Sequence, residues 1–345
     1  MELLTPFKRD GWQLQSRAVM APMTRGFADF KTGIIHPDTV SYYQRRAQDG
    51  IGMIVTEGIA IAEEAKGTVG IPGLYTDEQT EAWKEVTDSV HQEGGKIIAQ
   101  LWHVGRLSHS YFTNGRKPLA PSSIKANGHT HRVRLPYEMP NEMTVYDIRN
   151  VIKQFVHAAY NAIKAGFDGV EIHAAHGYLI DQFHSTWTNI RKDRYGQNRY
   201  LFLEEILLAV GEAIGTNKII VRFSEHKDDS PLYAWEDPEK EIQMLIEVFH
   251  KTKIELLHPS VNEFSKPLAH HSLTLHELVR KYWDKIIIGV GNLTSASAEK
   301  ALKDGLIDLA AFGRPLLANS DFMHRTKASI PLKPYDSKIH LQQIK

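Results

Sequence analysis

Three side chains capable of acid–base or hydrogen-bonding chemistry, His173, His176 and Tyr178, lie within six positions of one another. They follow a short run of alternating apolar character that begins at Val170 and is typical of a buried strand. In parallel α/β sheets, ligands bind at the carboxyl ends of the strands. Any one of these residues has an ordinary packing role as its simplest explanation. Three of them together at a strand exit favour a functional site.

The elements that must position this cluster alternate along the whole chain. Apolar runs that predict strands occur at residues 17–21, 51–57, 96–101, 170–175, 219–224, 254–257, 286–289 and 309–312. A segment that predicts a helix lies between each successive pair, at residues 38–48, 77–92, 144–166, 200–213, 238–250, 274–283 and 295–304. Eight strand-then-helix units in series predict a closed (β/α)8 TIM barrel. A doubly wound open sheet is the alternative, but no Gly-x-Gly-x-x-Gly turn follows the first strand.

Two segments fall outside the repeating units. Residues 1–16 are expected to plug the end of the barrel opposite the site. Residues 102–143 are too long for an ordinary connection and carry many turn-forming Pro, Ser, Asn and Gly residues. We expect this excursion to form a small hairpin that lies over the site.

Composition limits the class of protein. The 345 residues include 41 basic and 41 acidic side chains and no cysteine. A net charge of zero gives no electrostatic argument for a nucleic-acid or membrane partner. The absence of cysteine excludes disulfides, thiolate metal sites and cysteine nucleophiles. The first residues lack a signal peptide and no apolar run approaches the length of a membrane span, so a cytoplasmic protein is expected. A homo-oligomer is compatible with the sequence.

Other strand ends contribute residues that suit an anionic ligand. Gly291 follows the seventh strand, and Gly313 and Arg314 follow the eighth, which is the usual position of a phosphate site in this fold. Arg222 and Gln100 are expected between this site and the histidines. Arg222 is too costly to bury unpaired, so it must meet an anionic ligand or a carboxylate. Its structural alternative is a salt bridge to Glu57 or Glu171.

The strand ends together resemble the Old Yellow Enzyme family of FMN-dependent ene-reductases. The most specific match is the run His173-Ala174-Ala175-His176-Gly177-Tyr178-Leu179. Further matches are Ala21-Pro22-Met23-Thr24-Arg25, Thr56-Glu57-Gly58, Ala99-Gln100-Leu101-Trp102-His103-Val104-Gly105-Arg106, Val221-Arg222 and Phe312-Gly313-Arg314-Pro315.

The resemblance implies a single FMN-binding barrel domain over residues 1–345, with residues 102–143 as its cap. By this resemblance, the isoalloxazine would be surrounded by Pro22, Thr24, Gly58, Gln100 and Arg222. The FMN phosphate would be held by Gly291, Gly313 and Arg314. His173 and His176 would bind the activating oxygen of an electron-poor alkene, and Tyr178 would protonate its α-carbon. NADPH, with NADH as the alternative, would supply the hydride.

The sequence also departs from the family pattern in three loops. The run after Gly196 is shortened at residues 197–199, the segment after Ser224 lacks the common glycines, and the sixth strand ends in His258-Pro259-Ser260. A metal-dependent barrel hydrolase using His173, His176, His103 and Glu57 is the main alternative function. Against it, no His-x-His follows the first strand and no Asp ends the eighth. A flavin- or phosphosugar-binding barrel without turnover is a second alternative.

Overall fold

Eight parallel strands close into a barrel in the computed structural model, which describes residues 1–344. The strands are β3 (Ala18–Met20), β4 (Met53–Ala60), β5 (Lys96–Trp102), β8 (Gly169–His176), β9 (Ile219–Lys227), β10 (Leu256–Pro259), β11 (Ile286–Gly289) and β12 (Leu309–Phe312). The closing pair is β12 with β3, in which Ala311 is opposite Val19. The TIM barrel predicted from the alternating apolar runs is confirmed.

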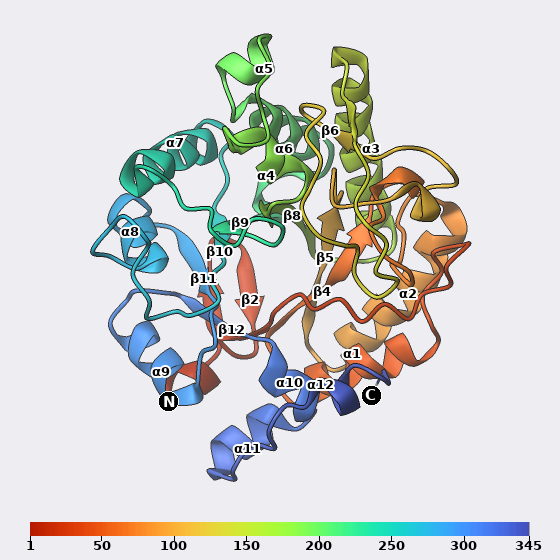
Figure 1. Cartoon of the computed structure of the whole chain (residues 1–345). Helices are drawn as coiled ribbons and strands as arrows, with labels where there is room; N and C mark the ends of the chain where they lie inside the picture. Colours follow the sequence, from red (N-terminus) through yellow and green to blue (C-terminus); the bar gives the residue numbers. More distant parts are fainter. Residues whose placement is uncertain (345) are drawn as a thin grey trace.

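Helices surround the strands, as Figure 1 shows. Seven of them connect successive strands or follow them: α1 (Asp38–Gln48), α2 (Asp77–Gln92), α3 (Val145–Lys164), α6 (Leu201–Ile214), α7 (Pro238–Lys251), α8 (Leu275–Tyr282) and α9 (Ser295–Lys303). Shorter helices are α4 (Leu179–His184), α5 (Arg194–Gln197), α10 (Arg314–Ala318), α11 (Phe322–Ala328) and α12 (Ser337–His340). The 3-10 turns are Glu2–Leu4, Glu63–Ala65, Ser110–Phe112 and Thr216–Lys218. No helix within residues 1–344 is long and apolar enough to cross a bilayer.

Local sequence explains where the main helices begin. Thr76, Thr144, Thr274 and Thr294 each cap a helix, and each makes a reciprocal capping box with the side chain three positions later. Such a box satisfies two amide groups that have no partner inside the helix. Helices α1 and α2 match their predicted bounds, although Pro37 rather than Asp38 is the N-cap of α1.

An N-terminal hairpin of β1 (Phe7–Arg9) and β2 (Trp12–Leu14) closes one end of the barrel. Phe7, Trp12 and Leu14 pack with the inward-facing side chains of the strands, including Val55 and Ile220. Alternate strand residues such as Ile54 instead pack against the helices, as the period of two requires. Burial of the hairpin's apolar side chains against the barrel interior therefore holds it in place.

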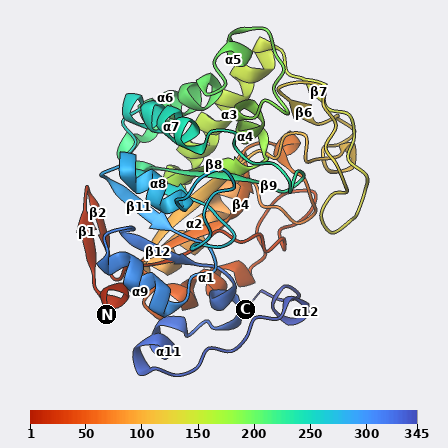
Figure 2. The same cartoon turned by 60° about the vertical axis from the view of Figure 1, so that its left-hand side comes forward.

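The excursion after β5 lies at the opposite end from this hairpin (Figure 2). Its two short strands, β6 (Leu119–Ala120) and β7 (Asn141–Glu142), pair in parallel. The expected hairpin is therefore wrong for these strands, because a parallel pair needs a long connection between its members. A single antiparallel bridge between His129 and Pro136 turns the chain at the tip.

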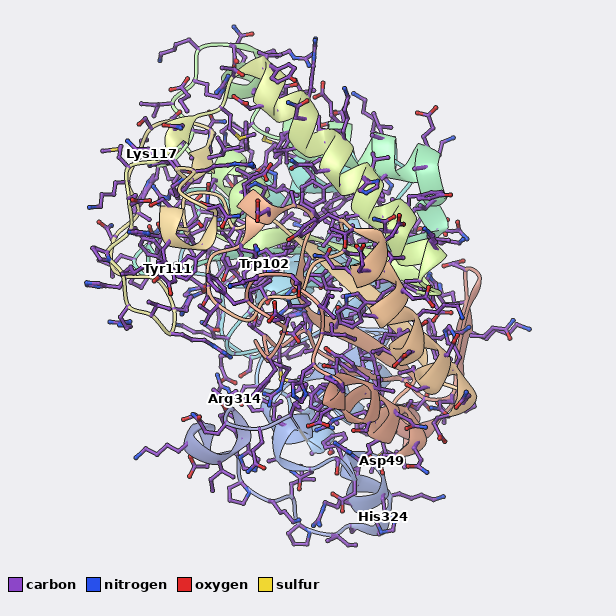
Figure 3. All side chains as sticks on the ribbon, turned by 90° about the vertical axis from the view of Figure 1, so that its right-hand side faces the viewer. Asp49, Trp102, Tyr111, Lys117, Arg314 and His324 are labelled. Carbon is purple, nitrogen blue, oxygen red and sulfur yellow. The ribbon has the colours of Figure 1, made fainter. Side chains whose placement is uncertain are left out.

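The C-terminal segment returns along the outside of the barrel. Both carboxylate oxygens of Asp49 accept hydrogen bonds at the start of α11, from the amides of Met323 (2.6 Å) and His324 (3.1 Å). Figure 3 shows Asp49 and His324 side by side. Further on, Arg25 donates to the carbonyl oxygens of His340 (2.8 Å) and Gln343 (2.7 Å). The end of the chain is thus tied to the loop that follows the first barrel strand.

Candidate functional site

A cavity of about 190 Å³ opens at the carboxyl ends of the barrel strands. It brings together five of the predicted cofactor-binding residues, which come from four strand ends far apart in the sequence. These are Pro22 after β3, Arg222 in β9, Gly291 after β11, and Gly313 and Arg314 after β12. Closure of the barrel places these strand ends around one opening.

The cavity wall near Gly291 leaves no room for a side chain. Gly291 has φ +139°, and a Cβ atom there would lie 2.7 Å from Val261 Cγ2 and 2.8 Å from the Phe264 nitrogen. Glycine is the residue that tolerates both conditions. Arg314 is exposed at the cavity and makes no ion pair with any side chain of residues 1–344. In the view of Figure 3 it lies between Trp102 and the C-terminal helices.

Arg222 reaches a carboxylate only through an intervening imidazole. Its Nη1 lies 2.7 Å from His258 Nε2, and His258 Nδ1 lies 2.6 Å from Glu171 Oε2. Gln100 completes the row by donating to Glu171 Oε1 at 2.7 Å. Burial, reinforced by the charge of Arg222, lowers the pKa of His258 to about 4, so the imidazole is neutral. The neutral ring donates from Nδ1 to Glu171 and accepts at Nε2 from Arg222.

The direct salt bridge considered for Arg222 therefore does not form within the described chain. Glu57 instead accepts from the backbone amides of Arg25 and Gly26, both at 2.8 Å. Arg222 Nη2 donates to Ser260 Oγ at 2.9 Å, while its buried Nε has no hydrogen-bond partner in the described part of the chain. An unpartnered donor beside the cavity suits an acceptor supplied by a ligand.

The second half of the site is the cluster at the end of β8. The ring centroid of His173 lies 5.2 Å from that of His176 and 5.0 Å from that of Tyr178. Trp102 covers the cluster from β5, 4.9 Å from the Tyr178 ring and 6.0 Å from the His173 ring. The structure therefore brings the three predicted catalytic side chains together.

Both histidines of the cluster are neutral. Burial lowers the pKa of His173 well below its usual value, and the charge of Arg222 adds to the effect. Burial, followed by the neighbouring His173 and Arg222, likewise lowers the pKa of His176. His173 Nδ1 accepts from the amide of Ala175 at 3.3 Å. Its proton therefore resides on Nε2, which can donate a hydrogen bond to a bound oxygen.

Tyr178 is a protonated phenol held by an acidic neighbour. Its hydroxyl donates to Asp228 Oδ2 at 3.0 Å. Burial raises the pKa of Tyr178 well above its usual value, and the Asp228 carboxylate raises it further. The hydroxyl therefore keeps its hydrogen through the neutral range.

The remaining predicted cofactor residues lie outside the cavity lining. Thr24 is exposed in the loop after β3. Gly58 packs against Trp102, whose Cε3 atom would lie 2.2 Å from a Cβ at this position. Gln100 is buried and connects to Arg222 only through Glu171 and His258.

Sequence reasoning gave no role to His258, Ser260 or Asp228. The first two were visible as an unusual end of the sixth strand, and their pairing with Arg222 follows from the register that aligns His258 with Arg222. Asp228 lies in the divergent segment after β9, and no sequence pattern indicated its contact with Tyr178. Among residues 1–344, no three His, Asp or Glu side chains form a group suited to hold a metal ion.

The chain matches the model of the NADH:flavin oxidoreductase / NADH oxidase family over residues 2–333. The chain belongs to this family, the Old Yellow Enzyme family. It is therefore an NAD(P)H-dependent flavin oxidoreductase with FMN as its cofactor.

Relatives of this Old Yellow Enzyme family member cover nearly its whole length. The flavin oxidoreductase hxnT of Emericella nidulans is 35% identical, over 97% of this chain and 92% of the relative. 12-oxophytodienoate reductase 2 of Arabidopsis thaliana is also 35% identical, over 97% and 90% of the two chains. The old yellow enzyme homologue of Zymomonas mobilis superposes with a TM-score of 0.85 at 32% identity, covering 97% of this chain and 94% of that one.

A further solved relative is morphinone reductase in complex with tetrahydroNAD. It superposes with a TM-score of 0.88 at 31% identity, covering 99% of this chain and 94% of the other.

The residues present fit FMN. The close approach at Gly291 exposes backbone to the cavity, Arg314 is an unpaired cation at its edge, and the buried Arg222 Nε lacks an acceptor. An anionic phosphate and a polar flavin edge are the partners that such groups require.

Proposed function

We propose that the protein reduces electron-poor alkenes, such as α,β-unsaturated carbonyl compounds, with nitro compounds and quinones as further candidate substrates. Bound FMN supplies the hydride transfer from NAD(P)H to the β-carbon of the alkene. The observation that carries the proposal is a protonated tyrosine beside two neutral histidines at the end of β8. His176 Nε2 lies 3.0 Å from Ser260 Oγ, which also accepts a hydrogen bond from the cavity-lining Arg222.

In this proposal His173 and His176 hold the oxygen of the substrate. Negative charge develops on a carbonyl or nitro oxygen as the β-carbon accepts the hydride. A neutral imidazole N–H stabilises that charge, and loss of one such donor costs roughly 10²–10³ in rate. The hydrogen on His173 Nε2 has no acceptor among residues 1–344, which supports this assignment.

We assign the protonation of the α-carbon to Tyr178. The O–H bond of the phenol breaks, a C–H bond forms on the substrate, and a phenolate remains on the protein. A phenol suits this role because it stays protonated at neutral pH. The raised pKa of Tyr178 supports this role.

The cofactor-binding roles follow the family pattern. Pro22, Thr24, Gly58, Gln100 and Arg222 are proposed to surround the isoalloxazine, and Gly291, Gly313 and Arg314 to hold the phosphate. The proposal takes residues 1–345 as one FMN-binding domain capped by residues 102–143. NADPH is the proposed reductant in preference to NADH. A homo-oligomeric state and a cytoplasmic location stay predictions.

Tyr178→Phe tests the proposed acid. We expect the variant to slow reoxidation of the reduced protein by an enone by roughly 10²-fold or more. Reduction by NADPH should be nearly unchanged, because no proton reaches carbon in that half-reaction. Stopped-flow measurement of both half-reactions checks this, and equal slowing of the two would remove the assignment.

The double variant His173→Ala/His176→Ala should lose affinity for phenol ligands, which place an anionic oxygen at the same position.

A further inference from the structure

The divergent segment after β9 extends the hydrogen bond of Tyr178 to a second side chain. Asp228 Oδ2 accepts from the Tyr178 hydroxyl at 3.0 Å, and Asp228 Oδ1 lies 3.4 Å from His226 Nε2. The carboxylate therefore touches the tyrosine with one oxygen and the histidine with the other. No other hydrogen bond of the Tyr178 hydroxyl occurs within residues 1–344.

This row of three side chains runs from the buried site towards water. Tyr178 is 7% exposed, whereas the side chains of Asp228 and His226 are 34% and 37% exposed. The outer two groups are therefore in contact with solvent. Histidine is the side chain best suited to take a proton from water in the neutral range.

The segment is held rigidly on both sides of Asp228. Lys227 pairs with the buried Asp181 at 2.5 Å, and Asp229 pairs with the buried Arg106. The amide of Asp228 itself donates to the carbonyl of His176 at 3.1 Å. The carboxylate is thus fixed beside the tyrosine by its neighbours in the chain and does not depend on the Tyr178 contact for its position.

We propose that His226 and Asp228 form a relay that returns a proton to Tyr178 after each turnover. The inference rests on the proposed function of Tyr178 as the acid. When Tyr178 has given its proton to the α-carbon, the imidazolium form of His226 passes its Nε2 proton to Asp228 and becomes a neutral imidazole, and Asp228 passes a proton to the phenolate oxygen and is again a carboxylate. His226 is then reprotonated by solvent. One proton enters per turnover, and no electrons move in the relay.

The other titratable groups around these three side chains do not offer a competing path. Tyr178 faces His173 and His176 from β8, Tyr137 from the excursion, and Asp229. The two histidines are neutral at the working pH, and burial raises the pKa of Tyr137 to about 12. His226 also faces His176, and shares a surface groove with Glu225, Glu263 and Lys266.

The substitution Asp228→Asn separates the relay from simple positioning. The amide oxygen of asparagine still accepts from the Tyr178 hydroxyl, but the side chain cannot carry a proton. The FMN-loaded protein is reduced anaerobically and mixed with an enone in weak buffer that contains a pH-indicator dye. Flavin absorbance then reports reoxidation, and the dye reports uptake of the proton from solvent.

In the unmodified protein we expect proton uptake to coincide with reoxidation. In Asp228→Asn, proton uptake should lag behind reoxidation by roughly tenfold or more. Added imidazole buffer should shorten the lag by supplying a mobile acid. Glu236→Gln, an exposed substitution in the same segment, is the matched control and should leave the two signals together.

Two results would overturn the relay. In the first, uptake stays synchronous with reoxidation in Asp228→Asn. In the second, both signals slow together, which would make Asp228 a positioning residue only. Failure of the acid assignment is recognised separately, because Tyr178→Phe would then leave reoxidation unchanged. Thermal unfolding of Asp228→Asn confirms that the variant is folded.

Discussion

His258 lies between the buried side chains of Arg222 and Glu171 and keeps them from direct contact. A direct contact would draw the Arg222 guanidinium towards Glu171 and away from the cavity. The neutral imidazole between them bridges the guanidinium and the carboxylate through two hydrogen bonds of 2.7 and 2.6 Å. Arg222 Nε, beside the cavity, therefore has no hydrogen-bond partner among residues 1–344. The residue that keeps the arginine available is not itself a cavity-lining residue.

His258→Ala should weaken FMN binding and destabilise the fold. The substitution leaves Arg222 and Glu171 with unmet hydrogen-bonding groups, at about 1–3 kcal/mol for each buried group. Fluorescence titration with FMN and urea unfolding measure the two effects. His184→Ala is the control, because His184 is also buried but does not line the cavity. It should lower stability and leave the FMN affinity unchanged; equal loss of affinity in both variants would contradict the role of His258.

At the scale of elements, the loop after β3 is held from three directions. The Glu57 carboxylate accepts hydrogen bonds from the amides of Arg25 and Gly26. Arg132 of the excursion donates to the carbonyl oxygens of the same two residues at 2.6 and 2.8 Å. The C-terminal segment accepts from the Arg25 side chain. Gly26 has φ +65°, and a Cβ there would lie 2.6 Å from the Arg132 guanidinium. This loop carries Pro22 and Thr24 of the proposed flavin site.

Arg132→Ala should loosen the excursion. Two hydrogen bonds are lost at a partly exposed position, for about 1 kcal/mol in all. That corresponds to roughly fivefold more frequent local opening. Limited proteolysis of the excursion measures the change. Arg134→Ala is the control, because Arg134 shares the left-handed backbone conformation but makes no hydrogen bond to the loop. Identical cleavage rates for the two variants would refute the contact.

Protonation of Glu57 should make stability depend on pH. Burial raises the pKa of Glu57 from 4.5 to about 7, so the folded protein binds this proton more tightly than the unfolded chain. The corresponding stabilisation, roughly 3 kcal/mol, is complete below about pH 4.5 and is lost as the pH rises to about 7. Urea unfolding across this range measures the decline. Glu57→Gln should remove it, since glutamine accepts the same amide hydrogens without titrating.

At the scale of elements, helix bounds were predictable from the sequence, whereas contacts between distant segments were not. The bounds of α1 and α2 were predictable because capping residues and helical periodicity are local signals. The parallel pair of β6 and β7 was not, because twenty residues separate its strands and no local pattern encodes such pairing. The His258–Arg222 contact lies between neighbouring strands, so it required the register. Asp228 reaches Tyr178 across 50 positions of sequence.

At the scale of the whole molecule, the two ends of the barrel differ in composition and in role. The hairpin end is apolar and closed by Phe7, Trp12 and Leu14, whereas the opposite end carries the cavity and the charged networks. Stability and chemistry are thus separated along the barrel axis, as is usual for this fold. Substitutions at the hairpin should therefore affect folding without altering the site.

Trp12→Ala tests this separation. Removal of a large buried aromatic side chain should cost about 3–5 kcal/mol of unfolding free energy. The affinity for FMN should not change at temperatures where the variant is folded. Urea unfolding and fluorescence titration provide the two measurements. Gln13→Ala, an exposed position in the same strand, is the control and should change neither. A loss of FMN affinity in Trp12→Ala would show that the two ends are coupled.

The hydrogen bonds from Arg132 to the carbonyls of Arg25 and Gly26 connect the excursion to the loop that carries part of the proposed flavin site. Because coupling free energies are reciprocal, any factor by which the closed excursion tightens FMN binding is the factor by which FMN tightens the closed excursion. A chain that lacks flavin is then the one whose excursion opens first to a protease. Turnover of the protein in a cell would follow its flavin content, so that loaded molecules persist and empty ones are removed.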